Sequence, residues 1–161
     1  MKFIVDFMLG RLCKWLRLLG YNTSYFVPNE GQYLMSHSSA KKGNILYQSL
    51  KEQRIIITRN RRLTTRKAFG LVLLESDKLN EQIKEVSKKV DLKISKDKIF
   101  TRCIICNKKI FPVKKEQVKN KVPSYVYQTQ KVFYICNFCG RIYWKGSHWD
   151  HIISQLKNML K

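Results

Sequence analysis

Four cysteines in two matched pairs are the residues of this chain best suited to specific chemistry. Cys103 and Cys106 form one C-x-x-C pair, and Cys136 and Cys139 form the other. A C-x-x-C turn can place two thiolates on one tetrahedral ion, and two such turns complete a closed four-cysteine site. Disulfides are the alternative, but they are rare in the intracellular setting that we expect for this chain. The pattern therefore predicts structural Zn2+ with no open position for catalysis.

Asp6 is the second candidate because of its place in the sequence. The apolar run over residues 3–5 predicts a buried strand that ends at this carboxylate, and helical spacing of apolar residues follows as far as Leu19. Gly20 stands where a helix C-cap is expected. Ligands of open α/β sheets bind at the carboxyl ends of the strands, so Asp6 marks a candidate site. Capping of the helix is the alternative role.

The elements that would position Asp6 alternate between strand and helix. Strands are predicted over residues 23–27, 54–58 and 71–74, and helices over residues 44–53 and 76–90. In the first of these helices Ile45, Leu46 and Leu50 are expected to face inward, and Ser76 or Asp77 is expected to cap the second. Near-continuous apolar strands such as RIIIT favour a parallel sheet with helices on both faces.

Polar residues follow each predicted strand, and parallel strands bring their carboxyl ends to one edge of the sheet. The residues expected to converge there are Asp6, Glu30, Asn60, Glu75 and Asp77.

The chain divides into three parts by composition. We expect an α/β domain over residues 1–93, a charged linker over 94–98, and a zinc ribbon with a C-terminal helix over 99–161. Aromatic-rich segments flank the second cysteine pair and predict a hairpin over residues 132–144. His148 and His151 lie three apart in the final helix, where a surface role is favoured because no third metal ligand is nearby.

The charge of the chain indicates a polyanionic partner. Its 161 residues include 32 Lys and Arg against 11 Asp and Glu, a formal net charge of +21, and the excess runs through both halves. Such an imbalance repels itself unless a polyanion neutralises it, and nucleic acid is the leading candidate. No apolar run approaches the roughly 18 residues of a membrane span. We expect an intracellular protein, cytoplasmic or in a mitochondrion or plastid.

Basic residues expected to contact phosphate lie on the first helix, after the strand at 54–58 and in the ribbon. They are Arg11, Lys14, Arg17, Arg59, Arg61, Arg62, Arg66, Lys67, Lys108, Lys109, Lys114, Lys115, Arg141 and Lys145. Tyr143, Trp144 and Trp149 either stack on exposed bases or fill the core of the ribbon.

Three stretches in this order resemble one family. They are MKFIVDFMLGRLCKWLRLLGY at the start, RIIITRNRRL in the middle and CNFCGRIYWKGSHW near the end. Together they resemble the Mut-seven C-terminal RNase family, a PIN-like domain fused to a zinc ribbon. The resemblance covers almost the whole chain. It implies a PIN-like, Rossmann-like α/β fold and descent from a ribonuclease that holds Mg2+ or Mn2+ in a cluster of acids.

The acids of this chain match the family pattern in part. Asp6 matches its first acid, whereas Asn60 stands where the pattern has an acid after Thr-Arg. Glu30 at best represents the acids expected after the second strand, and Asp77 lies in a stretch where the family also carries acid. An asparagine brings no negative charge, so a hard dication would be held more weakly. The pattern therefore predicts a degraded catalytic site.

These observations favour an RNA-binding protein of ribonuclease ancestry that acts within a ribonucleoprotein such as a ribosome. An active Mg2+- or Mn2+-dependent endoribonuclease using Asp6, Glu30 and Asp77 is the first alternative. A protein-interaction adaptor with the ribbon as its contact surface is the second.

Overall fold

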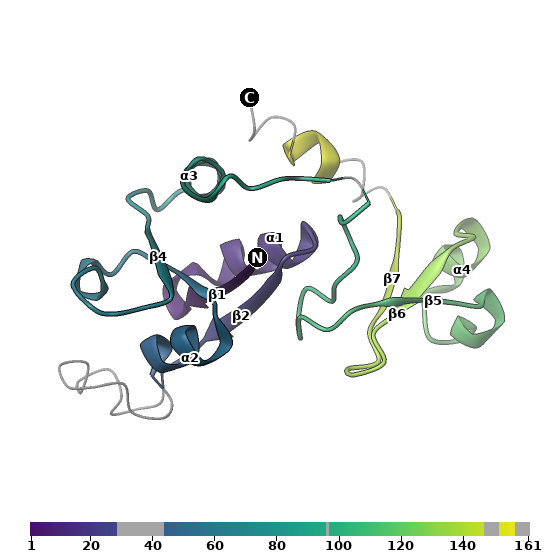
Figure 1. Ribbon diagram of the computed structural model, residues 1–161. Coiled ribbons are helices and arrows are strands. Elements are labelled where there is room, and N and C mark those ends of the chain that lie inside the picture. Colours follow the sequence, from purple (N-terminus) through teal and green to yellow (C-terminus); the bar gives the residue numbers. More distant parts are fainter. Residues whose placement is uncertain (29–43, 96, 147–151, 157–161) are drawn as a thin grey trace.

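A computed structural model describes residues 1–28, 44–95, 97–146 and 152–156 of the chain (Figure 1). An α/β domain is followed by a separate antiparallel ribbon. The helices and strands are β1 (Lys2–Asp6), η1 (Phe7–Leu9), α1 (Gly10–Leu18), β2 (Asn22–Phe26), α2 (Ile45–Glu52), β3 (Ile55–Thr58), η2 (Arg61–Leu63), β4 (Gly70–Leu73), α3 (Leu79–Val90), β5 (Phe111–Val113), η3 (Lys115–Val118), α4 (Ser124–Thr129), β6 (Phe133–Ile135) and β7 (Ile142–Trp144), where η denotes a 3-10 helix.

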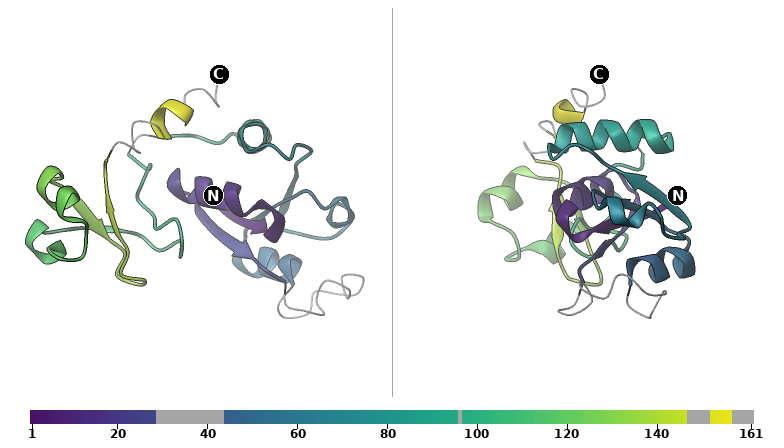
Figure 2. Two further views of the ribbon diagram at one scale, coloured as in Figure 1. Left: turned by 180° about the vertical axis from the view of Figure 1, so that it is seen from behind. Right: turned by 90° about the vertical axis from the view of Figure 1, so that its left-hand side faces the viewer.

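The α/β domain is built on a parallel four-stranded sheet in the order β2-β1-β3-β4. Successive side chains of a strand point to opposite faces, so apolar strands such as β1 bury both. Phe3 and Val5 pack in the cluster that includes residues of α1 and α3, whereas Ile4 packs with Ile45 and Leu46 of α2. Helices therefore cover both faces of the sheet, as Figure 2 shows from two further sides, and the predicted α/β fold class is confirmed.

Two details of the predicted helices are wrong. Leu50 of α2 is 39% exposed, and Ser49 is the buried residue of that turn. The Ser49 hydroxyl donates to the carbonyl oxygen of Arg54 at 2.7 Å and accepts from the Phe69 N–H at 3.1 Å. The N-cap of α3 is Lys78, and neither Ser76 nor Asp77 occupies that position. A buried polar residue is accommodated in α2 because both its hydrogen bonds are satisfied.

Gly20 follows the end of the first helix as expected, and it also allows residues 98–100 to pack against that end. Its φ is +88°, and a Cβ built there would lie 2.2 Å from the carbonyl oxygen of Lys98. Phe100 N–H then donates to the carbonyl oxygen of Leu18 at 2.7 Å. A side chain at position 20 would push the linker away from the end of α1, so glycine is required there.

The ribbon is a three-stranded antiparallel sheet in the order β5-β6-β7. The predicted hairpin is confirmed as β6 and β7. The third strand β5 and the short helix α4 were not predicted. Val118, Val126 and Phe133 form a small cluster of their own, so the segment between β5 and β6 adds a second core to the ribbon.

The last described residues, 152–156, are helical and pack against the α/β domain. Leu156 is 3% exposed and belongs to the same apolar cluster as Phe3 and Val5. The sequence grouped this helix with the ribbon, but its apolar side chains lie on the α/β domain. His148, His151 and Trp149 lie outside the described residues. None of the helices in the described part of the chain is long and apolar enough to cross a membrane.

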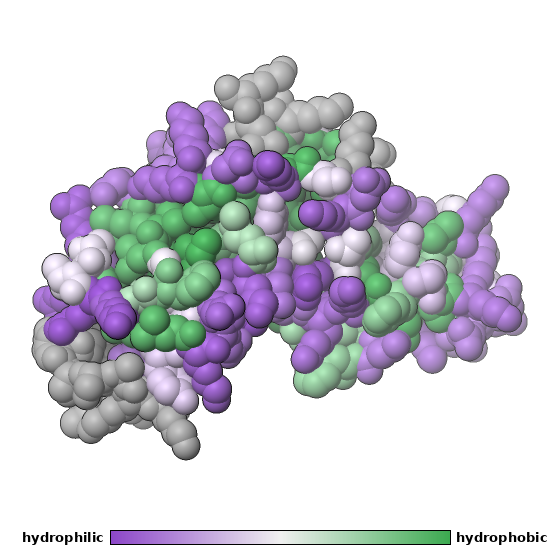
Figure 3. All heavy atoms as spheres, viewed as in Figure 1, coloured by the Kyte–Doolittle hydropathy of each residue, from purple (hydrophilic) through white to green (hydrophobic). Residues whose placement is uncertain are grey.

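Hydrophilic residues (purple in Figure 3) gather where the α/β domain meets the ribbon, and the surface is hollowed between them on that face. This junction involves the first cysteine pair and the edge strand β2.

Candidate functional site

The four predicted metal ligands come together in the ribbon. The sulfur atoms of Cys103, Cys106, Cys136 and Cys139 all lie within 4.8 Å of one another. Three of the Sγ–Sγ distances are 3.6 Å, 3.4 Å and 3.7 Å. A tetrahedral ion with Zn–S bonds of about 2.3 Å requires sulfur atoms about 3.8 Å apart. The four thiols could therefore hold a metal ion such as zinc.

The backbone around each pair explains how the thiols converge. In the first knuckle (residues 103–108) Asn107 has φ +65°, and its N–H donates to the Cys103 carbonyl oxygen at 3.0 Å. In the second knuckle (residues 136–141) Gly140 has φ +71°, and its N–H donates to the Cys136 carbonyl oxygen at 2.8 Å. A left-handed residue in the same place closes both turns. The matched geometry fits a tetrahedral site made of four thiolates.

Hydrogen bonds around the thiols favour an anionic sulfur at the centre of the cluster. The Tyr143 hydroxyl lies 2.9 Å from the Cys103 Sγ. Burial opposes ionisation of Cys103, but hydrogen bonds from Tyr143 and from the Cys106 and Ile105 amides lower its pKa to about 6. Burial, reinforced by hydrogen bonds with the other thiols, raises the pKa of Cys106 to about 12. Tyr143 therefore uses its hydroxyl to contact a thiol of the cysteine cluster.

Asp6, at the carboxyl edge of the parallel sheet, is 6% exposed, and each of its carboxylate oxygens accepts one hydrogen bond from the protein. Its Oδ1 accepts the Phe7 N–H at 2.8 Å, and its Oδ2 accepts the Thr58 hydroxyl at 2.7 Å. The Thr58 Oγ1 in turn accepts the Asn60 N–H at 3.0 Å, and the Asn60 Oδ1 accepts the Arg62 N–H at 3.1 Å. A chain of hydrogen bonds thus joins the ends of β1 and β3 and fixes the turn that follows β3.

Among the described residues, Asp6, Glu75 and Asp77 do not form a set of three acids that could hold one ion. Apart from the cysteines, no three Asp, Glu, His or Cys side chains of the described residues converge closely enough to hold an ion. Glu75 pairs with Arg61 at 2.7 Å, Asp77 is exposed, and Glu30 lies outside the described residues. Catalytic roles for Asp6, Glu30 and Asp77 therefore stay predictions.

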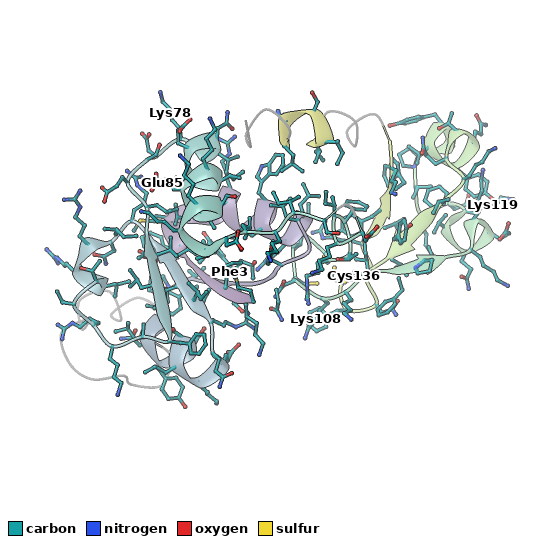
Figure 4. All side chains as sticks on the ribbon, turned by 45° about the horizontal axis from the view of Figure 1, so that its top comes forward. Phe3, Lys78, Glu85, Lys108, Lys119 and Cys136 are labelled. Atoms are coloured by element: carbon teal, nitrogen blue, oxygen red, sulfur yellow. The ribbon has the colours of Figure 1, made fainter. Side chains whose placement is uncertain are left out.

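Glu85 of α3 occupies this edge without having been predicted. Its carboxylate accepts the N–H groups of Glu75 and Ser76, each at 3.0 Å. Burial opposes its ionisation, but these two hydrogen bonds and the nearby Lys89 together lower the pKa of Glu85. Figure 4 shows this residue on α3.

One predicted phosphate contact is buried. Arg17 is 7% exposed, and its Nε donates to the Thr23 carbonyl oxygen at 2.8 Å. Its Nη1 donates to the carbonyl oxygens of Ile104 and Ile105 at 3.0 and 2.6 Å. Arg17 therefore joins α1 to the first knuckle, and little of its side chain is exposed. The remaining predicted contacts at the carboxyl edge, Arg59, Arg61, Arg62, Arg66 and Lys67, are exposed.

Basic residues of the ribbon also have defined surroundings. Lys108 lies over the ring of Phe138, 5.4 Å from its centroid, and Lys115 lies over that of Tyr127 at 4.9 Å. Phe138 is 72% exposed between the two cysteines of the second knuckle. In Figure 4 Lys108 lies beside Cys136 at the end of the ribbon that faces the α/β domain, and Lys119 lies at the far end.

The Mut7-C RNAse domain model matches residues 1–156, and so covers both the α/β domain and the ribbon. This chain belongs to the Mut7-C RNase domain family. Comparisons with curated proteins and with solved structures find no match. Membership gives the chain a nuclease-related domain, and it accords with the α/β sheet and the cysteine cluster described above.

The junction between the two parts of this Mut7-C family chain is a further site that the sequence did not reveal. Asn107 of the first knuckle accepts the Thr23 N–H at 3.0 Å and donates to the Asn22 Oδ1 at 2.8 Å. Arg102 Nε donates to the Gly20 carbonyl oxygen at 3.1 Å. The first knuckle thereby covers part of the free edge of β2. These contacts join residues more than 80 positions apart, and no local pattern signals them.

Proposed function

We propose that this Mut7-C family protein binds RNA, that its catalytic site is degraded, and that it acts within a ribonucleoprotein such as a ribosome. The state of Asp6 carries the proposal. Asp6 matches the first acid of the family pattern, but both of its carboxylate oxygen atoms accept hydrogen bonds from the protein. A hard dication prefers several anionic oxygens, and the described residues present no such set.

The surface charge supports RNA as the partner. Arg59, Arg62, Arg66 and Lys67 are exposed beside the carboxyl edge, and none of them has an ion-pair partner among the described residues. Lysine and arginine side chains that neutralise phosphates release condensed counterions, which gives a binding free energy that depends steeply on salt. The net charge of +21 leaves a large surplus for this purpose.

We further propose that the cysteine cluster binds structural Zn2+. All four positions of a tetrahedral ion would be filled by sulfur, so the ion would hold the two knuckles together without taking part in chemistry. The Asn107 and Gly140 turns and the Tyr143 hydrogen bond are consistent with this role.

The test is a combined binding and cleavage assay on labelled, mixed-sequence RNA, with Mn2+, with EDTA, and with Asp6→Ala beside the wild type. We expect binding that weakens steeply with salt and no metal-dependent cleavage. Cleavage that requires Mn2+ and is lost in Asp6→Ala would instead make the protein an active endoribonuclease. Absence of any salt-dependent RNA binding would favour the adaptor alternative.

A further inference from the structure

An open cleft of about 390 Å3 lies between the α/β domain and the first knuckle. It runs along the edge strand β2, with Tyr25 of that strand and Gln48 of α2 on one side and Lys108 of the first knuckle on the other. Figure 3 shows a hollow in the surface, lined with hydrophilic residues, at this junction. The volume falls within the roughly 300–1,000 Å3 typical of ligand pockets, although the lining is polar and not apolar. We call it the interdomain cleft.

Three arginines line the interdomain cleft, and each is held at two of its three guanidinium nitrogens. Arg17 and Arg102 use Nε and Nη1 to donate to backbone carbonyl oxygens of β2, the α1–β2 turn and the first knuckle. Arg54 uses the same two nitrogens to bind Glu52, Asn22 and the Phe3 carbonyl oxygen. The guanidinium groups are therefore immobilised before any ligand arrives.

The third nitrogen, Nη2, of Arg17, Arg54 and Arg102 has no hydrogen-bond partner among the described residues. No fully buried side-chain nitrogen or oxygen in this part of the chain lacks a partner. These three Nη2 atoms are therefore not fully buried, and the residues that carry them line the interdomain cleft. Such a pre-organised set of N–H donors suits a tetrahedral oxyanion.

Positive charge in the cleft is poorly compensated. Glu52 is the acid that pairs with one of the three arginines, and its side chain is 44% exposed. Arg17 and Arg102 donate to neutral acceptors throughout, and Lys108 adds a fourth cation at the rim. A bound anion would relieve the repulsion that this arrangement creates.

We propose that the interdomain cleft binds the phosphate backbone of a single RNA strand, with Arg17, Arg54 and Arg102 as fixed donors. The inference rests on the proposed RNA-binding function and assigns it a site away from the carboxyl edge. A cleft of this volume is too small for a duplex. Tyr25, which is 42% exposed and anchored by its hydroxyl to the Phe7 carbonyl oxygen, offers a ring on which a base can stack.

The test places a carboxylate in the cleft without removing any arginine. Gln48→Glu changes one amide to an acid of the same shape within α2, and none of the hydrogen bonds of the described residues uses the Gln48 side chain. Glutamate favours a helix as well as glutamine does, so the fold is retained. Gln128→Glu is the matched control, because Gln128 is exposed on α4 and does not line the cleft.

Binding of a labelled mixed-sequence single-stranded RNA would be measured by fluorescence anisotropy at several salt concentrations. We expect Gln48→Glu to raise the Kd at least about fivefold at roughly 0.1 M salt, since the new charge lies among four cations. Gln128→Glu should change the Kd less than about twofold. The melting temperature of Gln48→Glu should equal or exceed that of the wild type, because the acid also neutralises the arginines.

Equal, small effects of the two substitutions, with wild-type RNA binding intact, would overturn the cleft assignment and leave the proposed function standing. Absence of wild-type RNA binding would instead overturn the proposed function. Inorganic phosphate and a mononucleotide serve as competitors. If either displaces RNA at a concentration near the Kd of the RNA itself, the cleft is a small-anion site and the RNA assignment is wrong. Weak competition, in the millimolar range or above, supports a strand that makes further contacts.

Discussion

Charged side chains at the carboxyl edge of the sheet differ in their hydrogen bonding from those along its free edge, β2. At the carboxyl edge, Asp6 and Glu85 accept hydrogen bonds from the backbone and from Thr58, so their charge is used to hold turns together. Along β2, Arg17 and Arg102 also donate hydrogen bonds to the backbone, yet the Nη2 of each has no hydrogen-bond partner among the described residues. One edge has its acids satisfied, whereas the other keeps its cations partly unsatisfied.

This contrast explains where function can persist when an acid is lost. A metal site needs several carboxylates at once, so in the proposed degraded site the neutral side chain of Asn60 would leave a metal ion more weakly held. Phosphate binding adds up over many cations, so it tolerates the loss of any one. A nuclease-related α/β domain can therefore lose cleavage and still bind its former substrate.

Substitution of the predicted cysteine ligands should have the largest effect, because it should disrupt the cleft along β2 and leave the carboxyl edge intact. Cys103→Ser or Cys139→Ser should release zinc and disorder the ribbon, because structural zinc contributes on the order of 10 kcal/mol to such sites. The cleft should be lost with the first knuckle, while the carboxyl edge persists. Metal analysis gives the zinc content, and amide hydrogen exchange of β1 and β3 reports the edge.

Cys13→Ser is the control for these variants. Cys13 is 1% exposed in the core of the α/β domain and lies outside the cysteine cluster. It should keep one zinc per chain. Retention of one zinc per chain in both Cys103→Ser and Cys139→Ser would refute the assignment of four cysteine ligands.

The next largest effect is expected at Gly20, which lets the linker approach the end of α1. Gly20→Ala should destabilise the fold by about 3 kcal/mol, because it combines φ +88° with a contact of 2.2 Å to backbone. Gly140→Ala is the matched variant, since Gly140 has φ +71° but no atom within 4 Å of the place that a Cβ would occupy. It should cost only about 1 kcal/mol. Denaturant unfolding measures both, and equal losses would contradict the packing argument.

A smaller effect is expected at Asp6 and distinguishes a structural acid from a metal ligand. Asp6→Asn should destabilise the protein by about 2 kcal/mol. The two carboxylate oxygens now accept hydrogen bonds from the Phe7 N–H and the Thr58 hydroxyl, and in the variant an amide NH2 would face one of these donors. Acids kept for catalysis commonly reduce stability, so their neutralisation has the opposite sign. Unfolding in EDTA is the measurement. An increase in stability of Asp6→Asn would show that the acid is held for chemistry and not for structure.

The smallest effect concerns pH at the same edge. The pKa of Glu85 is lowered, so its contribution to stability is present above the unfolded pKa of about 4.3 and is lost as the pH falls through the folded pKa. Glu85→Gln should lose less stability than the wild type on acidification from about pH 5 to about pH 3. Thermal unfolding across this range tests the sign. Glu81→Gln is the control, because the Glu81 side chain is more exposed and, within the described residues, pairs with Lys84 alone.

Local sequence was sufficient for the strands and main helices of the α/β domain and for the cysteine cluster, but not for β5 and α4 of the ribbon. Apolar runs predicted β1, β3 and β4, because strands buried on both faces need apolar residues throughout. The C-x-x-C spacing located the cysteine cluster, because two close thiols and a left-handed residue are a local requirement. The apolar pattern was misleading at Leu50, where the buried position belongs to Ser49 and its hydrogen bonds.

Residue types and their spacing were enough to establish the α/β fold class, the cysteine cluster and the surplus of positive charge, since each depends on neighbours along the chain. The burial of Arg17 and the hydrogen bond from Thr58 to Asp6 became visible only in the folded chain. The same holds for the cleft that Arg54 and Arg102 share. Those outcomes depend on contacts between segments far apart in sequence, and a charged side chain carries no local signal of the partner it will meet.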